Sequence, residues 1–180
     1  MKDQSTSSEK TKRPGAKHGL NNEFTVFADV KPGHEKAIRE TIEKWGRDPK
    51  KLERIHRITT LHERRYVLFD HDRRVMFCTT FDGTWDKYID DFGAAGVEYF
   101  NDIFQHVVGY PGITDPSIKD YIQAHQITAS EYTRAYEATV IEILKALRVS
   151  KAFQQVLDDP KAAQALKHPA LKPLLDQAVD

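Results

Sequence analysis

Apolar and polar residues first alternate with a period of two, which predicts a β-strand over residues 23–30. One face of this strand is apolar and carries Phe24, Val26 and Ala28. Pro32 and Gly33 end it. In residues 34–45 the apolar side chains recur at helical spacing with charges between them, and Gly46 follows. This pattern predicts a half-buried helix after the strand.

Two further strands are predicted at residues 64–69 and 74–81, and both faces of each look apolar. In the second strand, Val75, Phe77 and Phe81 point to one face, while Met76 and Cys78 point to the other. The residues between the strands, DHDR, suit a tight turn. The preceding residues 47–60 are basic and poorly periodic, and they are predicted to form a connection.

Helical patterns dominate the rest of the chain. Thr84 is placed to cap a helix whose apolar spacing continues to about Val108, with bends expected at Gly93 and Gly96. Residues 117–125 predict a short helix behind Asp115 and Pro116. Residues 131–137 alternate weakly and predict a fourth strand, whereas residues 138–180 read as helices broken at prolines.

This order of elements predicts an α+β fold of the ferredoxin-like βαββαβ type, in which an antiparallel four-stranded sheet carries both helices on one face. Residues 23–137 form this predicted domain. Residues 1–22 contain almost nothing to bury and are predicted to be a disordered tail. Residues 138–180 are predicted to be a C-terminal helical extension.

The second apolar face of the hairpin needs a cover, because each large apolar side chain left in water costs about 1.5–3 kcal/mol relative to burial. The C-terminal helices, a sheet from a second subunit, or an apolar ligand could provide it. We expect a homodimer that pairs two sheets as a dimeric α/β barrel, because symmetric pairing is the commonest way for soluble chains to bury such a patch.

Composition narrows the function classes. The 180 residues include 27 basic and 27 acidic ones, so no net positive charge attracts nucleic acid and no nucleic-acid partner is expected. A single cysteine, Cys78, excludes an intrachain disulfide and a multi-thiolate zinc site, which fits a reducing cytoplasm. No apolar run reaches the roughly 18 to 20 residues of a membrane span, and no secretory signal is recognisable. A cytoplasmic protein is therefore expected.

Three stretches of the chain resemble the dimeric α/β-barrel superfamily; they read LHERRYVLFDHDRRVMFCTTFDGTWDKYIDDF, FQHVVGYPG and EYTRAYEATV. The resemblance covers residues 23–137 and is to a bacterial group similar in plan to dye-decolorizing peroxidases, chlorite dismutases, haem-degrading monooxygenases and cofactor-free antibiotic-biosynthesis monooxygenases. It implies a cavity between helices and sheet that holds a haem (haem b) or a hydrophobic small molecule. The GxxDG signature of dye-decolorizing peroxidases is missing from the sequence.

His106 is the candidate axial ligand, and thus the candidate metal ligand, for such a haem. It lies near the end of the long predicted helix, where Asp102 could accept its second ring proton. The alternative interpretation is a histidine that interacts with the helix dipole.

Four further residues are candidates for the site. Arg65 could hold a carboxylate, a haem propionate or a peroxide, or else be an edge arginine paired with an acid. His62 is a candidate cofactor contact, although strict alternation puts it on the opposite face from Arg65 unless the strand has a bulge. Asp82 is a candidate general base at a strand end, and Tyr110 could contact the ligand or anchor its turn.

Two functions follow from these observations. The first is a haem-dependent oxidoreductase, peroxidase- or monooxygenase-like, that acts on a hydrophobic small molecule. The alternative is a homodimeric small-molecule-binding or interaction module without cofactor or catalysis. A phosphate-binding glycine loop, a nucleophile elbow and an HExxH motif are all missing from the sequence, which disfavours nucleotide enzymes, serine hydrolases and zinc proteases.

Overall fold

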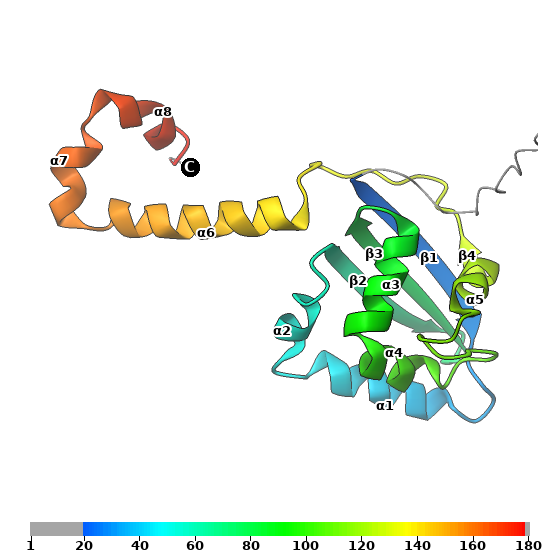
Figure 1. Cartoon of the computed structure of the whole chain (residues 1–180). Coiled ribbons are helices and arrows are strands. Elements are labelled where there is room, and N and C mark those ends of the chain that lie inside the picture. Colours follow the sequence, from blue (N-terminus) through cyan, green and yellow to red (C-terminus); the bar gives the residue numbers. More distant parts are fainter. Residues whose placement is uncertain (1–19, 179–180) are drawn as a thin grey trace, which may run out of the picture. The chain divides into compact units, whose positions relative to one another are not determined.

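A computed structural model describes residues 20–178 of the chain (Figure 1). It divides into two compact units, with the boundary between Val140 and Ile141. Unit 1 contains the strands β1 (Asn21–Asp29), β2 (Leu61–Phe69), β3 (Arg74–Asp82) and β4 (Gln126–Ile127). Its helices are α1 (Glu35–Gly46), α2 (Lys51–Ile55), α3 (Trp85–Ala95), α4 (Val97–Phe104) and α5 (Ile118–His125).

The four strands form one antiparallel sheet in the order β2-β3-β1-β4. This order and the succession of elements are those of the ferredoxin-like fold, so the predicted fold class is confirmed. Figure 1 shows the helices of unit 1 on one face of the sheet, which we call the inner face. The opposite face is called the outer face.

The core lies between the inner face and the helices, and it is rich in aromatic residues. The buried aromatic residues are Phe24, Trp45, Phe77, Phe81, Trp85, Tyr88, Phe92, Phe100 and Phe104. Phe81 of β3 and Tyr88 of α3 stack with ring centres 3.9 Å apart, and the Tyr88 hydroxyl hydrogen-bonds to Thr79. The predicted alternation of β1 and β3 is confirmed, because Phe24, Val26, Val75, Phe77 and Phe81 are all buried on this face.

The outer face has a polar end and an apolar end, so the expectation of a wholly apolar second face is only partly correct. At the polar end, Thr80 of β3 lies between Glu23 of β1 and Glu63 of β2 in the strand register. The next row consists of Thr25, Cys78 and Arg65. The apolar end, with Val67 38 % exposed, carries Phe27, Val67, Phe69 and Met76.

The segment 128–139 runs from β4 to α6 (Val140–Leu157) without forming a strand, so the predicted strand at residues 131–137 is wrong. The fourth strand is the two-residue β4, which lies immediately before this segment. The Asn21 side chain donates a hydrogen bond of 2.9 Å to the Glu137 carbonyl, and Arg134 contacts His62. These bonds hold the segment against the polar end of the sheet.

Three other elements differ from the predictions. The strand β1 begins at Asn21, two residues early, while residues 1–19 of the predicted tail lie outside the described residues. The basic stretch 47–60 contains the short helix α2. The predicted long helix is two helices, α3 and α4, that meet at Gly96. A Cβ atom at Gly96 would lie 3.2 Å from the Phe100 ring, which explains why glycine suits this junction.

Unit 2 is helical, as expected for the C-terminal residues. It contains most of α6, then α7 (Ala163–Leu166) and α8 (Lys172–Leu175), with 3-10 turns at Pro160–Ala162 and Pro169–Leu171. None of its described residues, 141–178, is buried. Among the described residues, no helix combines the length and the apolar character that crossing a membrane would require.

Candidate functional site

Two predicted site residues, His62 and Asp82, are hydrogen-bonded to each other. His62 Nε2 lies 2.7 Å from Asp82 Oδ1, and the side chains are 7 % and 10 % exposed. Because the carboxylate accepts at Nε2 and the Arg134 guanidinium donates at Nδ1 over 3.0 Å, the histidine fits the tautomer protonated at Nε2. Both ring nitrogens therefore have partners.

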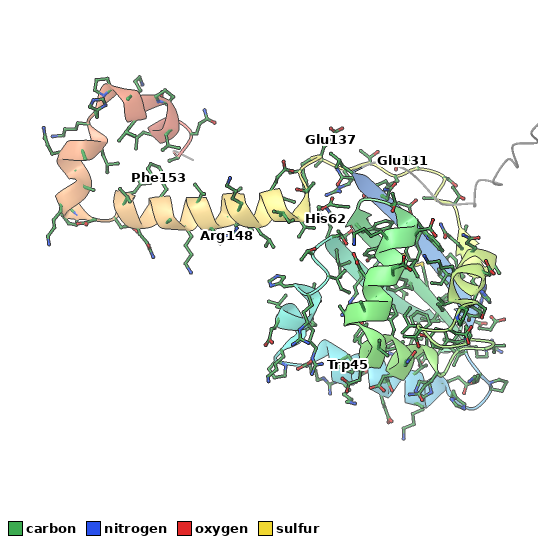
Figure 2. All side chains as sticks on the ribbon, in the orientation of Figure 1. Trp45, His62, Glu131, Glu137, Arg148 and Phe153 are labelled. Atoms are coloured by element: carbon green, nitrogen blue, oxygen red, sulfur yellow. The ribbon has the colours of Figure 1, made fainter. Side chains whose placement is uncertain are left out.

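Asp82 also holds the end of the segment 128–139. Its Oδ2 accepts a hydrogen bond of 2.7 Å from the backbone N–H of Val140. His62, Asp82, Arg134 and the Val140 amide are called the anchor cluster below, and Figure 2 shows His62 beneath the path of this segment. The anchor cluster fixes the segment to the sheet, and its hydrogen bonds engage both Asp82 oxygens.

A β-bulge brings His62 into this cluster. The pairing of β2 with β3 shifts register between Leu61 and Glu63, so His62 is the extra residue. A bulge was the feature that would allow His62 and Arg65 to lie on the same side of β2. Both residues line a hollow of about 320 Å³ beside this strand. The bulge thus overrides the strict alternation that separates these two residues in the sequence.

A cleft of about 270 Å³ lies over the polar end of the outer face. We call it the outer cleft. Strands β1, β2 and β3 supply its floor, and residues 129–132 form one wall. Its polar and small lining residues are Glu23, Thr25, Glu63, Arg64, Arg65, Cys78, Thr79, Thr80, Ala129, Glu131 and Tyr132.

The charged groups that lie on the outer face beside this cleft are three carboxylates, those of Glu23, Glu63 and Glu131, and the guanidinium of Arg65. Arg64 also lines the cleft, but its guanidinium stacks on the Tyr99 ring. Arg65 makes no ion pair within residues 20–178, so the alternative of an edge arginine paired with an acid does not describe it there. Like charges placed across a sheet repel one another. The outer cleft is therefore a site of net negative character with one available cation.

Tyr132 and Cys78 add neutral groups to the outer cleft. Burial raises the pKa of Tyr132; the nearby Arg134 opposes this shift, while Glu23 and Glu63 add to it. The Tyr132 hydroxyl is thus protonated at neutral pH and lies close to these charges. The Thr25 hydroxyl donates to Cys78 Sγ at 3.4 Å, which places the thiol on the cleft floor.

The cavity between sheet and helices, where the resemblance implies a haem, is small. Its volume is about 30 Å³, and its lining is aliphatic and aromatic, including Tyr110 and Tyr121 but no histidine. Such a volume holds about one or two water molecules, whereas ligand pockets commonly measure about 300–1,000 Å³. A haem does not fit this cavity.

Tyr110 anchors the loop after α4. Its hydroxyl donates a hydrogen bond of 2.8 Å to Asn101 Oδ1, which also accepts from the Ile113 amide at 3.1 Å. Burial raises the pKa of Tyr110 well above its usual value and raises that of Tyr121 to about 12. This geometry corresponds to the turn-anchoring alternative for Tyr110.

His106 lies outside that cavity, directly after α4. Its Nδ1 is 2.9 Å from Nδ1 of His34, and its Nε2 is 3.4 Å from the Thr41 hydroxyl. The expected partner Asp102 instead accepts a hydrogen bond of 3.1 Å from Trp45 Nε1, so the predicted Asp102–His106 bond is wrong. Within residues 20–178, no group of three or more His, Cys, Asp or Glu side chains is placed to hold a metal ion.

Sequence reasoning missed Arg134, Tyr132 and Glu23. Tyr132 and Arg134 are two residues apart in the segment predicted as a strand. Residues at this spacing point to the same side of an extended chain, which could have indicated that both face the sheet. Glu23 lies on the outer face of β1, where a polar residue fits the alternation and carries no signal of a site. No single motif marks these residues as one site.

Comparisons with known proteins add little to this geometry. No family model matches the chain, and no curated protein matches it. One similar solved structure is tetracenomycin F2 cyclase from Streptomyces glaucescens, described as a type-II polyketide cyclase. It shares 11 % sequence identity at a TM-score of 0.39, over 63 % of this chain and 98 % of the cyclase. A likeness at this level carries no functional argument, so the function must be inferred from the described residues.

Proposed function

We propose that the domain is a binding module that holds a small organic ammonium compound in the outer cleft. The observation that carries this proposal is the gathering of three carboxylates and one guanidinium around a cleft of about 270 Å³. Ligand sites commonly combine a concave surface with a few convergent polar groups. The volume lies near the lower end of the usual range, which favours a small metabolite over a large cofactor.

The position of the ammonium group follows from the strand register. Glu23 and Glu63 flank Thr80, and neighbouring strands lie about 4.8 Å apart, so the two carboxylates approach the centre of the floor from opposite sides. Their mutual repulsion falls when a cation binds between them. Arg65 lies one row farther along the sheet, where it is placed to receive a carboxylate when the ligand also carries one.

The segment 128–139 contributes the wall of this site. Tyr132 and Ala129 line the cleft, and the anchor cluster fixes the end of the segment through Arg134 and Val140. Because the two nitrogens of His62 and the two oxygens of Asp82 are engaged in these bonds, we assign this pair to holding the wall. This assignment replaces the general-base role predicted for Asp82 with a positioning role.

Isothermal titration with a panel of diamines, amino acids and monocarboxylates tests the proposal. We expect saturable binding of an ammonium compound, weakened about tenfold in Glu63→Gln, a loss that corresponds to about 1.4 kcal/mol. The matched control is Glu40→Gln, an exposed residue of α1 paired with Lys36, which should leave affinity unchanged. If no amine binds, or if both variants bind equally, the proposal is wrong.

Cys78 offers a second readout because it is the chain's one cysteine. A bound ligand should slow the reaction of this thiol with a thiol reagent, since the thiol lies on the cleft floor. Comparison of amino acids with diamines then shows whether Arg65 binds a carboxylate. The substitution Arg65→Gln should weaken the binding of amino acids and leave the binding of diamines unchanged. An unchanged thiol reaction rate at saturating amine would contradict the location of the site.

A further inference from the structure

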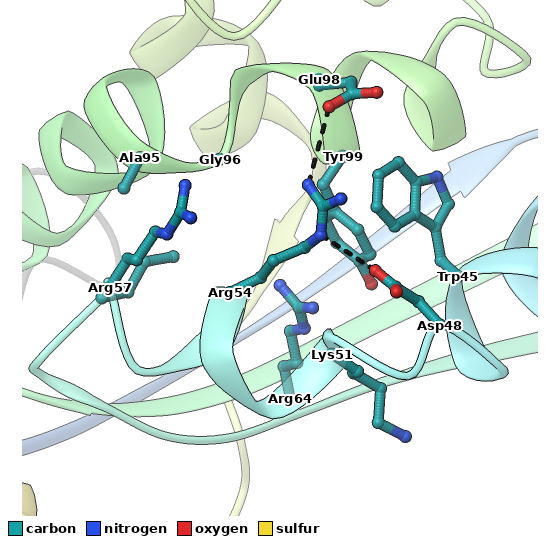
Figure 3. Close-up of a pocket in the computed structure, with 11 residues that line it drawn as sticks. Trp45, Asp48, Lys51, Arg54, Arg57, Arg64, Ala95, Gly96, Glu98 and Tyr99 are labelled. Carbon is teal, nitrogen blue, oxygen red and sulfur yellow. Dashed lines mark ion pairs between the residues drawn. The ribbon is translucent and has the colours of Figure 1, made fainter.

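A separate cavity of about 120 Å³ lies between the loop after α1, helix α2, strand β2 and the junction of α3 with α4 (Figure 3). Lys51, Arg54, Arg57 and Arg64 supply four cations to its lining, against the two carboxylates of Asp48 and Glu98. Arg64 alternates with Arg65 along β2 and therefore extends on the other side of the strand from the outer cleft. The cavity shares the residue Arg64 with the outer cleft, but it lies on the other side of strand β2.

Arg54 pairs with both carboxylates of this cavity. Its Nε lies 2.9 Å from Asp48 Oδ2, and its NH1 lies 3.7 Å from Glu98 Oε2. Figure 3 shows Arg54 stretched between these two acids. Because four cations face two carboxylates, the lining keeps a net positive charge.

Arg57 and Arg64 are two further cations that line the cavity, and Figure 3 shows both near Arg54. Arg57 has one ion pair, at 3.4 Å to Glu53 on the same stretch of chain, and both side chains are more than half exposed, at 61 % and 64 %. Arg64 makes no ion pair within residues 20–178. A partly buried guanidinium without a counter-charge is unfavourable, and an anion from solution would relieve this cost.

Aromatic rings hold the guanidinium groups in place. The Arg64 guanidinium lies 3.8 Å from the centre of the Tyr99 ring, and that of Arg54 lies 5.1 Å from the Trp45 ring. Stacking uses the flat face of a guanidinium and leaves its N–H groups, which lie in the plane, free to donate. The donors of Arg64 are thus oriented before a ligand arrives, which lowers the entropy cost of binding.

We propose that this cavity binds a phosphate group, either as inorganic phosphate or as the monoester of a small molecule, between Arg57 and Arg64. Phosphate oxygens accept paired hydrogen bonds from guanidinium groups. The volume is far below the roughly 300–1,000 Å³ of a pocket that encloses a whole ligand, so it suits one such group. The first turn of α4, which contributes Gly96, Glu98 and Tyr99, adds the positive end of a helix dipole.

Titration of the full chain with inorganic phosphate tests this proposal, with calorimetry and the fluorescence of Trp45, a lining residue, as readouts. We expect the dissociation constant to rise about tenfold in Arg64→Gln and severalfold in Arg57→Gln. Arg73→Gln is the matched control, because Arg73 is an exposed arginine paired with Asp70 on the hairpin turn. It should bind phosphate as the unchanged chain does.

Further titrations distinguish a phosphate monoester from inorganic phosphate as the ligand. They also distinguish specific phosphate binding from general anion binding. Tighter binding of glycerol phosphate than of inorganic phosphate supports a monoester ligand, and equal affinity supports recognition of the group alone. Acetate binding as tightly as phosphate, an equal loss in Arg73→Gln, or no saturable binding would overturn the proposal. If Arg64→Gln does not fold, as judged by circular dichroism, the exposed Arg57→Gln decides the question.

Discussion

Nε2 of His62 lies 2.7 Å from Oδ1 of Asp82, across the open end of the β2–β3 hairpin. The two side chains are about nine-tenths buried, and the same carboxylate accepts the Val140 amide. One buried side chain thereby connects the start of β2, the end of β3 and the residue at which α6 begins. Removal of a buried charged partner leaves the remaining donors unsatisfied, which costs more than the bond itself contributes.

Replacement of Asp82 by Ala should therefore lower the free energy of unfolding by about 3 kcal/mol. The reason is that the donors of His62 and Val140 lose their acceptor in a buried environment. Urea denaturation followed by circular dichroism measures the change. Asp90→Ala, an exposed α3 position paired with Lys119, should stay within about 0.5 kcal/mol of the unchanged chain. Similar midpoints for the two variants would contradict the anchoring role.

The stability of the domain should fall as the pH decreases below 6.5, the ordinary pKa of a histidine. Burial, His34 and Lys31 lower the pKa of His106, so the unfolded chain takes up this proton at a higher pH than the folded chain does. The contribution of His106 is thus present above 6.5 and lost as the pH falls through its folded pKa.

Urea midpoints measured across this range should depend less on pH in His106→Gln than in the unchanged chain. His56→Gln, at an exposed position, should leave the pH dependence of the urea midpoint unchanged. An NMR titration that places the pKa of His106 at or above its ordinary value would disprove the assignment.

The β2–β3 turn contains three successive residues with positive φ angles, at Asp70 (51°), His71 (55°) and Asp72 (64°). The left-handed region costs a residue with a Cβ atom about 1–2 kcal/mol, and Asp72 is held there by a bidentate pair with Arg39. His71→Gly should raise the free energy of unfolding by about 0.5 kcal/mol, because relief of the left-handed conformation exceeds the added chain entropy. Glu40→Gly within α1 should lower it by about 1 kcal/mol in the same urea assay. A loss of stability in both variants would count against strain at this turn.

The predicted homodimer would use the apolar end of the outer face. Because Val67 is 38 % exposed there beside Phe27, Phe69 and Met76, Val67→Lys should shift the mass in sedimentation equilibrium from dimer to monomer. Leu52→Lys serves as a control, since Leu52 is 64 % exposed on α2. A monomeric mass for the unchanged chain would make this prediction wrong.

The sequence was informative where the pattern was long and periodic. Strands β1, β2 and β3 are nine residues each, and their alternation identifies the inner face correctly. The two residues of β4 are too few to show any period, and they pair with β1 only after α5 has placed them. The weak alternation of residues 131–137 arose from contacts with the sheet face, which resemble a strand pattern but lack ladder hydrogen bonds.

Site geometry depended on features without a sequence period. His62 and Asp82 were both candidates, yet their contact needs the hairpin register together with a bulge at one residue. The spacing of Asp102 and His106 suggested a bond along one helix, but α4 ends at Phe104 and His106 turns toward His34. The sequence around Arg64 did not indicate a binding role, because the stacking of Arg64 on Tyr99 depends on where α4 lies.

The lack of buried residues in unit 2 has a thermodynamic consequence. Residues 141–178 expose Ile141, Leu147, Val149 and Val156 and have no interior of their own, so little heat-capacity change accompanies their melting. A calorimetric scan should consequently show one sharp endotherm from unit 1 and a broad, shallow helix–coil signal from unit 2. The measured enthalpy per residue would then fall below that of an ordinary domain of the same length.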